Sequence, residues 1–165
     1  MTAGERLADP DVRLQRARDL AWAALNRRDH TQVELQRAME RRRCGPEEIA
    51  TVLAELVEGG WVDDASYAQR FAEDRRTLDG WGAERIARKL RDLGVDPDAV
   101  EAAVAAQPAE DERAAAAEML RRRFPEPPED PRDRNRALAM LVRKGYELEL
   151  AHDVLRRHCG LTEFD

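Results

Sequence analysis

Arginine is the residue type whose number and placement could do chemistry in this chain. The sequence contains 26 arginines and only two lysines, Lys89 and Lys144. A guanidinium presents a planar fork of donors that binds a carboxylate or a phosphate through two parallel hydrogen bonds. This preference predicts recognition of an anionic partner. A genome that favours arginine over lysine would produce the same excess, and both explanations stay open.

Six arginines recur at matching positions of an internal repeat, and one tryptophan stands between two glycines. Together they are the predicted partner-binding residues: Arg37, Arg41, Arg85, Arg88, Arg136, Arg143 and Trp81. The arginines would lie on second helices of the repeats, away from the apolar stripe, where a shared basic face could follow a repetitive target. A solvated face with pairs such as Arg88 and Asp92 is the structural alternative. For Trp81 the alternative is packing against a neighbouring unit.

Residue patterns typical of catalysis or of bound cofactors are missing from the sequence. No Gly-rich loop ends in Lys-Ser or Lys-Thr, and the Gly-Trp-Gly at 80–82 lacks the strand–turn–helix setting of a phosphate loop. The histidines His30, His152 and His158 do not have metal-ligand spacing. We therefore expect no enzyme activity, no cofactor, no metal and no catalytic residue.

Composition and charge set further expectations for the whole chain. Charged residues make up 38% of the 165 residues, aromatic residues 5%, and the net charge is −6. The negative balance argues against general DNA coating, since phosphate neutralisation needs clustered cations. Two cysteines and the lack of a long apolar run predict a cytoplasmic protein with no membrane contact. We expect a monomer.

Residues that typically begin and end helices occur along the whole sequence, whereas strand patterns are missing. Thr31 and Glu34 form the pattern of a capping box, and Pro46 and Pro97 suit first helical positions. Gly59, Gly60, Gly80, Gly94 and Gly145 suit left-handed positions after helices. The prediction is an all-α protein.

A shift of 51 residues lays two-helix segments of the chain on one another without a gap, whereas the first helix of the third unit fits less well because the proline-rich stretch intervenes. The shift matches Leu35 with Ile86 and Met39 with Leu90, and a second shift continues the series at Leu141. Periods of this size indicate stacked helical units that cannot bury their apolar faces alone. We predict three tandem three-helix repeats in an elongated, slightly curved array. The predicted segments are a flexible N-terminus at 1–11, repeats at 12–63, 64–108 and 109–160 with a Pro-rich linker at 125–131, and a tail at 161–165.

Four stretches within residues 13–158 resemble the RecX family of regulatory proteins. Residues 21–35 are similar to the family's entry helix and its Ser/Thr-x-x-Glu-Leu cap. Residues 60–71 contain an aromatic followed by Asp-Asp and Tyr-Ala, which resembles the family's most specific stretch. Residues 80–95 resemble its second repeat, and residues 143–146 resemble the turn of its third repeat.

This resemblance implies a function that composition cannot show. It implies three tandem three-helix repeats that bind the RecA nucleoprotein filament, in its groove, and inhibit RecA recombinase and ATPase activity in DNA repair and recombination. The proline-rich stretch and the acidic balance depart from the family pattern, so direct DNA contact is expected to be weak or indirect. Two alternatives are a DNA-binding protein built of helix-turn-helix-like units and a helical adaptor for another partner.

Overall fold

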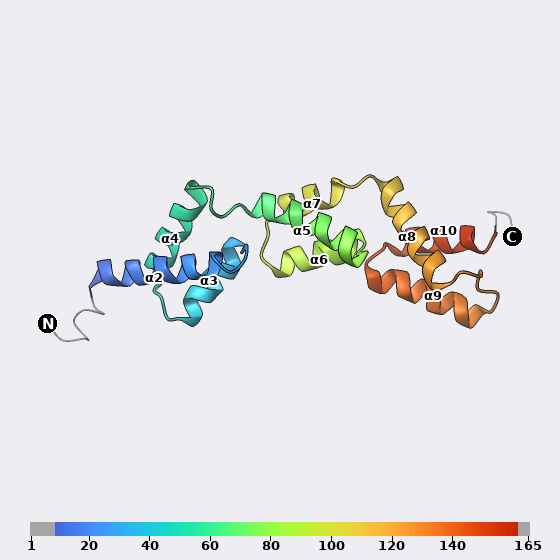
Figure 1. Cartoon of the computed structure of the whole chain (residues 1–165), viewed down its shortest axis with the longest axis horizontal. Coiled ribbons are helices and arrows are strands. Elements are labelled where there is room, and N and C mark those ends of the chain that lie inside the picture. The colour runs from blue at the N-terminus through green and yellow to red at the C-terminus, as the bar shows by residue number, and fades with distance from the viewer. Residues whose placement is uncertain (1–8, 162–165) are drawn as a thin grey trace. The chain divides into compact units, whose positions relative to one another are not determined.

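The structure is a computed structural model that describes residues 9–161 (Figure 1). Within that range the chain forms helices and no strands, which confirms the all-α prediction. The helices are α2 (Pro10–Leu25), α3 (Gln32–Arg41), α4 (Pro46–Glu58), α5 (Asp64–Asp79), α6 (Ala83–Asp92), α7 (Pro97–Ala105), α8 (Ala109–Arg123), α9 (Pro131–Lys144) and α10 (Leu148–His158).

The predicted ends of the chain fall largely outside the described residues. The flexible N-terminus at 1–11 overlaps them only at residues 9–11, and α2 already begins at Pro10. The tail at 161–165 overlaps them only at Leu161. Pro131, predicted to belong to the linker, is instead the first residue of α9. Its missing N–H costs nothing at that position, and Asp130 caps the helix by accepting from the Arg132 amide at 2.8 Å.

The chain is divided into two compact units. Among the described residues, unit 1 contains 9–67 and 92–99, and unit 2 contains 68–91 and 100–161. In unit 1, α2 packs on α3 and α4 around a core that includes Ala21, Leu35 and Val52. In unit 2, α8, α9 and α10 pack around a core that includes Leu141 and Tyr146 (Figure 1).

Burial follows the predicted repeat. Leu35 and Ile86 are both fully buried, and so are the next matched residues: Met39, Leu90 and Leu141. These side chains are at most 1% exposed in all three repeats. A repeated pattern of buried apolar side chains is what stacked helical units require. The predicted helical repeat is confirmed.

Glycines end several helices in the left-handed conformation, as predicted for Gly60, Gly80, Gly94 and Gly145. For Gly59 the prediction was wrong: its φ is −76°, and it continues the helical conformation before Gly60 turns the chain. A single left-handed residue after the helix is sufficient to end it.

Arg43 has a φ of 61° and is the only non-glycine residue in the left-handed region within the described chain. It occupies the repeat position of Gly94 and Gly145. We expect Arg43→Gly to raise the free energy of unfolding by about 1 kcal/mol, because glycine adopts this φ without the strain of a Cβ. Chemical denaturation would measure it. Arg42→Gly, at a φ of −94°, is the matched control and should not stabilise; equal effects at both positions would contradict the argument.

Candidate partner-binding surface

Two of the predicted arginines hold the ends of helices in their own unit. Arg37 Nη1 donates to the carbonyl of Asp92 at 3.3 Å in unit 1, and Arg85 Nη1 donates to the carbonyl of Arg143 at 3.3 Å in unit 2. Both acceptors lie at the C-terminal ends of second helices, where carbonyls lack partners within the helix. Part of the hydrogen-bonding capacity of Arg37 and Arg85 is therefore used within the fold.

In unit 2 the start of α6 is bonded to the turn between α9 and α10. The Gly82 amide donates to the Lys144 carbonyl at 2.8 Å, and the Glu84 amide donates to the Gly145 carbonyl at 3.0 Å. Tyr146 Oη donates to the Gly80 carbonyl at 3.2 Å. These bonds satisfy N-terminal amides of one helix with C-terminal carbonyls of another. They fix the second and third three-helix segments against each other within this unit.

Trp81 lies in this junction and is half-buried. Its ring meets the Phe71 ring edge to face, with centroids 6.2 Å apart. The guanidinium carbon of Arg85 lies 4.1 Å from the Trp81 ring centroid, and that of Arg75 lies 5.7 Å away. The indole therefore takes part in packing and in cation–π contacts. Its role in partner binding stays a prediction.

The other four predicted arginines are exposed. Arg136 pairs with Asp133 at 3.0 Å, one turn away on α9. Within the part of the chain that the structure describes, the side chains of Arg41, Arg88 and Arg143 have no ion pair or hydrogen bond. These three guanidinium groups are available to a partner.

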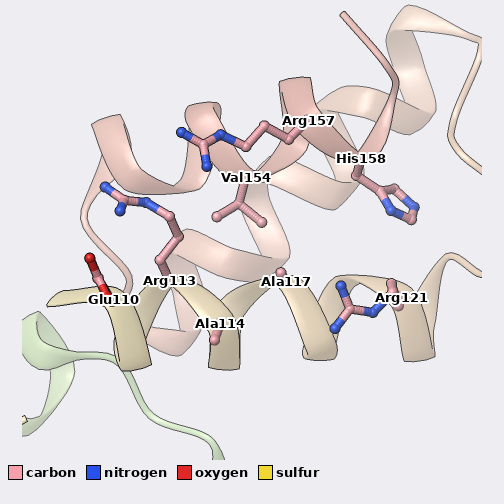
Figure 2. Close-up of a pocket in the computed structure, with 8 residues that line it drawn as sticks. All are labelled: Glu110, Arg113, Ala114, Ala117, Arg121, Val154, Arg157 and His158. Carbon is pink, nitrogen blue, oxygen red and sulfur yellow. The ribbon is translucent and has the colours of Figure 1, made fainter. Parts of the chain in front are cut away.

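A groove of about 620 Å³ runs between α8 and α10 (Figure 2). Val154 and Ala117 lie along it, and arginines border it from both helices. Each of these arginines already forms an ion pair with a carboxylate. The distance from a guanidinium nitrogen to an Asp153 oxygen is 3.4 Å for Arg113 and 3.2 Å for Arg157. The corresponding distance from Arg121 to Glu118 is 2.8 Å. Neutralised cations attract an anionic partner weakly. We call this surface the α8–α10 groove.

A second groove, of about 540 Å³, lies along α9 in the same three-helix segment. Its charged residues are arginines only, namely Arg123, Arg132, Arg136 and Arg143. Phe124 and Met140, both half-buried, line its apolar part. We call this surface the α9 groove. It brings together the predicted residues Arg136 and Arg143 and leaves the other five predicted residues elsewhere.

Several ionisable groups in the two units have pKa values shifted by their surroundings, among them Glu34, Arg76 and Tyr146. Burial raises the pKa of Glu34, but hydrogen bonds from the Arg28 guanidinium and the Thr31 amide outweigh it and hold the pKa below its usual range. Burial lowers the pKa of Arg76, which donates to the carbonyls of Ala103 and Val104. Burial raises the pKa of Tyr146 to about 12. All three belong to caps and junctions of the fold, and none lies on the α9 groove.

Within 9–161 no group of three histidine, cysteine, aspartate or glutamate side chains is placed to hold a metal ion. No helix in that range is long and apolar enough to cross a membrane.

Comparison with known proteins decides the family. Residues 63–104 match the sequence model for the second three-helix domain of RecX, and residues 110–155 match the model for the third. A regulatory protein RecX from Thermobifida fusca is 36% identical over 152 residues, which cover 90% of this chain and 82% of that protein. The chain belongs to the RecX family. The regulatory protein RecX of Chromobacterium violaceum is 30% identical over 131 residues, covering 79% of this chain and 83% of that protein.

Solved RecX structures share this fold. The crystal structure of RecX from Lactobacillus salivarius superposes with a TM-score of 0.77 at 17% identity and covers 91% of this chain and 98% of that one. A second RecX crystal structure also gives 0.77, at 20% identity, and covers 87% of this chain and 73% of that one. At such identities the likeness concerns the fold.

Sequence reasoning missed part of the α9 groove in this RecX family member. Neither Arg123 nor Arg132 is among the residues predicted to bind a partner. Arg132, Arg136 and Arg143 recur at spacings of 4 and 7 residues, which places them on one helix face. That spacing was visible in the sequence. The approach of Arg123 and Phe124 to this face was not, because it depends on how the proline-containing loop returns the chain to α9.

Proposed function

We propose that the chain binds the RecA nucleoprotein filament, in its groove, and inhibits RecA recombinase and ATPase activity without any chemistry of its own. The observation that carries the proposal is membership of the RecX family at 36% identity over most of a relative named a regulatory protein. The repeated three-helix segments and the exposed arginines support it, because a helical filament also presents the same surface at regular intervals. A body held in the groove would hinder access of a second DNA and subunit motions.

DNA-dependent ATP hydrolysis by the cognate RecA, titrated with this protein, tests the proposal. We expect inhibition at protein concentrations well below that of RecA, with weak binding of this protein to the same DNA alone. No effect at stoichiometric excess would contradict the proposed function. Inhibition that follows the chain's own binding to bare duplex DNA would favour the DNA-binding alternative. Indifference to both RecA and DNA would leave a helical adaptor for another partner.

Arg88 is the residue whose replacement best separates partner binding from folding. It is exposed and has no side-chain partner within 9–161, whereas Arg37 and Arg85 contribute to the fold. We expect Arg88→Glu to raise the concentration needed for half inhibition about tenfold, since a contact with an acidic or phosphate group becomes repulsive. Lys89→Glu is the control, because it makes the same charge change about 100° around the same helix. Equal losses for both variants would show that net charge, not this position, matters.

A further inference from the structure

The α9 groove differs from the α8–α10 groove in what surrounds its arginines. No carboxylate lines it, and within residues 9–161 the side chains of Arg132 and Arg143 have no ion pair or hydrogen bond. Arg123 lies against the Phe124 ring, with its guanidinium carbon 5.9 Å from the centroid. Arg136 has only its surface pair with Asp133. The groove therefore concentrates positive charge in a chain whose net charge is −6.

The apolar part of the groove is held in place by hydrogen bonds to the backbone. His158 Nε2 donates to the Phe124 carbonyl at 2.8 Å, which fixes the residue after α8. Arg134 donates to the carbonyls of Pro128 at 3.1 Å and Glu129 at 2.9 Å, which fixes the loop before α9. The groove is thus formed before any partner arrives, and a partner would not have to order it.

The arginines extend along three turns of α9, from Arg132 to Arg143. Eleven helical steps of 1.5 Å span about 16 Å, which an extended peptide covers with about five residues. A ligand of that length with carboxylates toward the arginines and an apolar side chain toward Phe124 and Met140 would use every part of the surface. Arginine pairs with carboxylates bidentately, and burial of apolar area adds affinity.

Nucleic acid is the other anionic ligand, and the observations favour it less. Phe124 is half-buried, and the Arg123 guanidinium already lies over its ring. It therefore offers little free face for a base, whereas single-strand binding sites present exposed aromatic rings. The net charge of −6 would also repel a long polyanion, but it opposes a short acidic peptide less.

From these observations we propose that the α9 groove is a peptide-binding site that recognises a short segment of a protein partner in which acidic residues flank an apolar one. The proposal goes beyond the proposed function. Its test uses neither RecA nor DNA filaments, so the two can fail separately.

The experiment measures fluorescence anisotropy of a labelled peptide, Asp-Glu-Leu-Glu-Phe-Glu-Asp, titrated with the full chain. We expect saturable binding that the double variant Arg132→Gln/Arg143→Gln weakens about tenfold. The matched control is Arg121→Gln/Arg157→Gln in the α8–α10 groove, which removes the same charge from the same three-helix segment (Figure 2). It should change the affinity less than about twofold, because those arginines are already paired.

Each other outcome would overturn the proposal. Equal losses of peptide affinity in the two double variants would show that the effect depends on total charge. No binding to the unsubstituted chain would show that the α9 groove is not a peptide-binding site. A peptide with serine in place of leucine and phenylalanine should bind more weakly; equal binding would remove the apolar part of the claim. A single-stranded oligonucleotide that binds more tightly and depends on Arg132 and Arg143 would assign the groove to nucleic acid. Circular dichroism melts of all variants would verify that the fold is kept.

Discussion

Replacement of Gly145 by alanine is expected to lower the free energy of unfolding of unit 2 by about 3 kcal/mol or more. Gly145 has a φ of 94°, which a side chain rarely adopts. An added Cβ would also meet the backbone of Arg85, 2.6 Å from its nitrogen and 2.9 Å from its Cα. Backbone atoms cannot rotate away, so the turn between α9 and α10 must move back from α6. That movement would break the bonds from Gly82 and Glu84 to Lys144 and Gly145.

Gly160 is the matched control for this prediction. It also has a positive φ, of 69°, and lies in unit 2, but an added Cβ would meet nothing within 4 Å. Gly160→Ala should therefore cost only the conformational strain, about 1 kcal/mol. Chemical denaturation of both variants, followed by circular dichroism, measures the difference. If Gly145→Ala costs no more than Gly160→Ala, the close approach to α6 does not contribute to stability.

The comparison of Gly145 with Gly94 shows what could be predicted from the sequence. Both glycines were predicted to end helices, and both have a positive φ. The sequence did not show that a second element lies against each of them, Val33 in unit 1 and Arg85 in unit 2. Whether a glycine ends a helix depends on that residue and its neighbours in the chain. Close approaches depend on how helices far apart in the sequence pack against each other, and a single sequence does not contain that information directly.

The arginines illustrate the same limit at the candidate surface. Their spacing predicted correctly that they lie on second helices away from the buried stripe. It could not separate Arg85, which bonds to a helix end, from Arg143, whose side chain has no partner within 9–161. All six carry the same charge and lie on amphipathic helices, so only tertiary contacts distinguish their roles. The α9 groove was incompletely predicted for this reason.

Thr31 is expected to be the most sensitive polar residue of unit 1. Within the described residues of unit 1, it is the only polar residue among the fully buried side chains. Its Oγ1 donates to the Leu93 carbonyl at 2.6 Å and accepts from the Glu34 amide at 3.2 Å. The Glu34 carboxylate accepts from the Thr31 amide at 3.0 Å, which completes the capping box of α3. A single hydroxyl therefore satisfies one helix start and one helix end.

Thr31→Val should lower the free energy of unfolding by about 2–3 kcal/mol, because it removes the cap and leaves the Leu93 carbonyl without this donor. Valine keeps the shape of threonine, so the loss reports the hydroxyl rather than a cavity. Thr31→Ser keeps the hydroxyl, removes one methyl group and should cost about 1 kcal/mol. Urea denaturation gives both values, and hydrogen exchange at the Glu34 amide should accelerate only in the valine variant. A serine variant as unstable as the valine variant would show that packing of the methyl group, rather than the two hydrogen bonds, holds Thr31 in place.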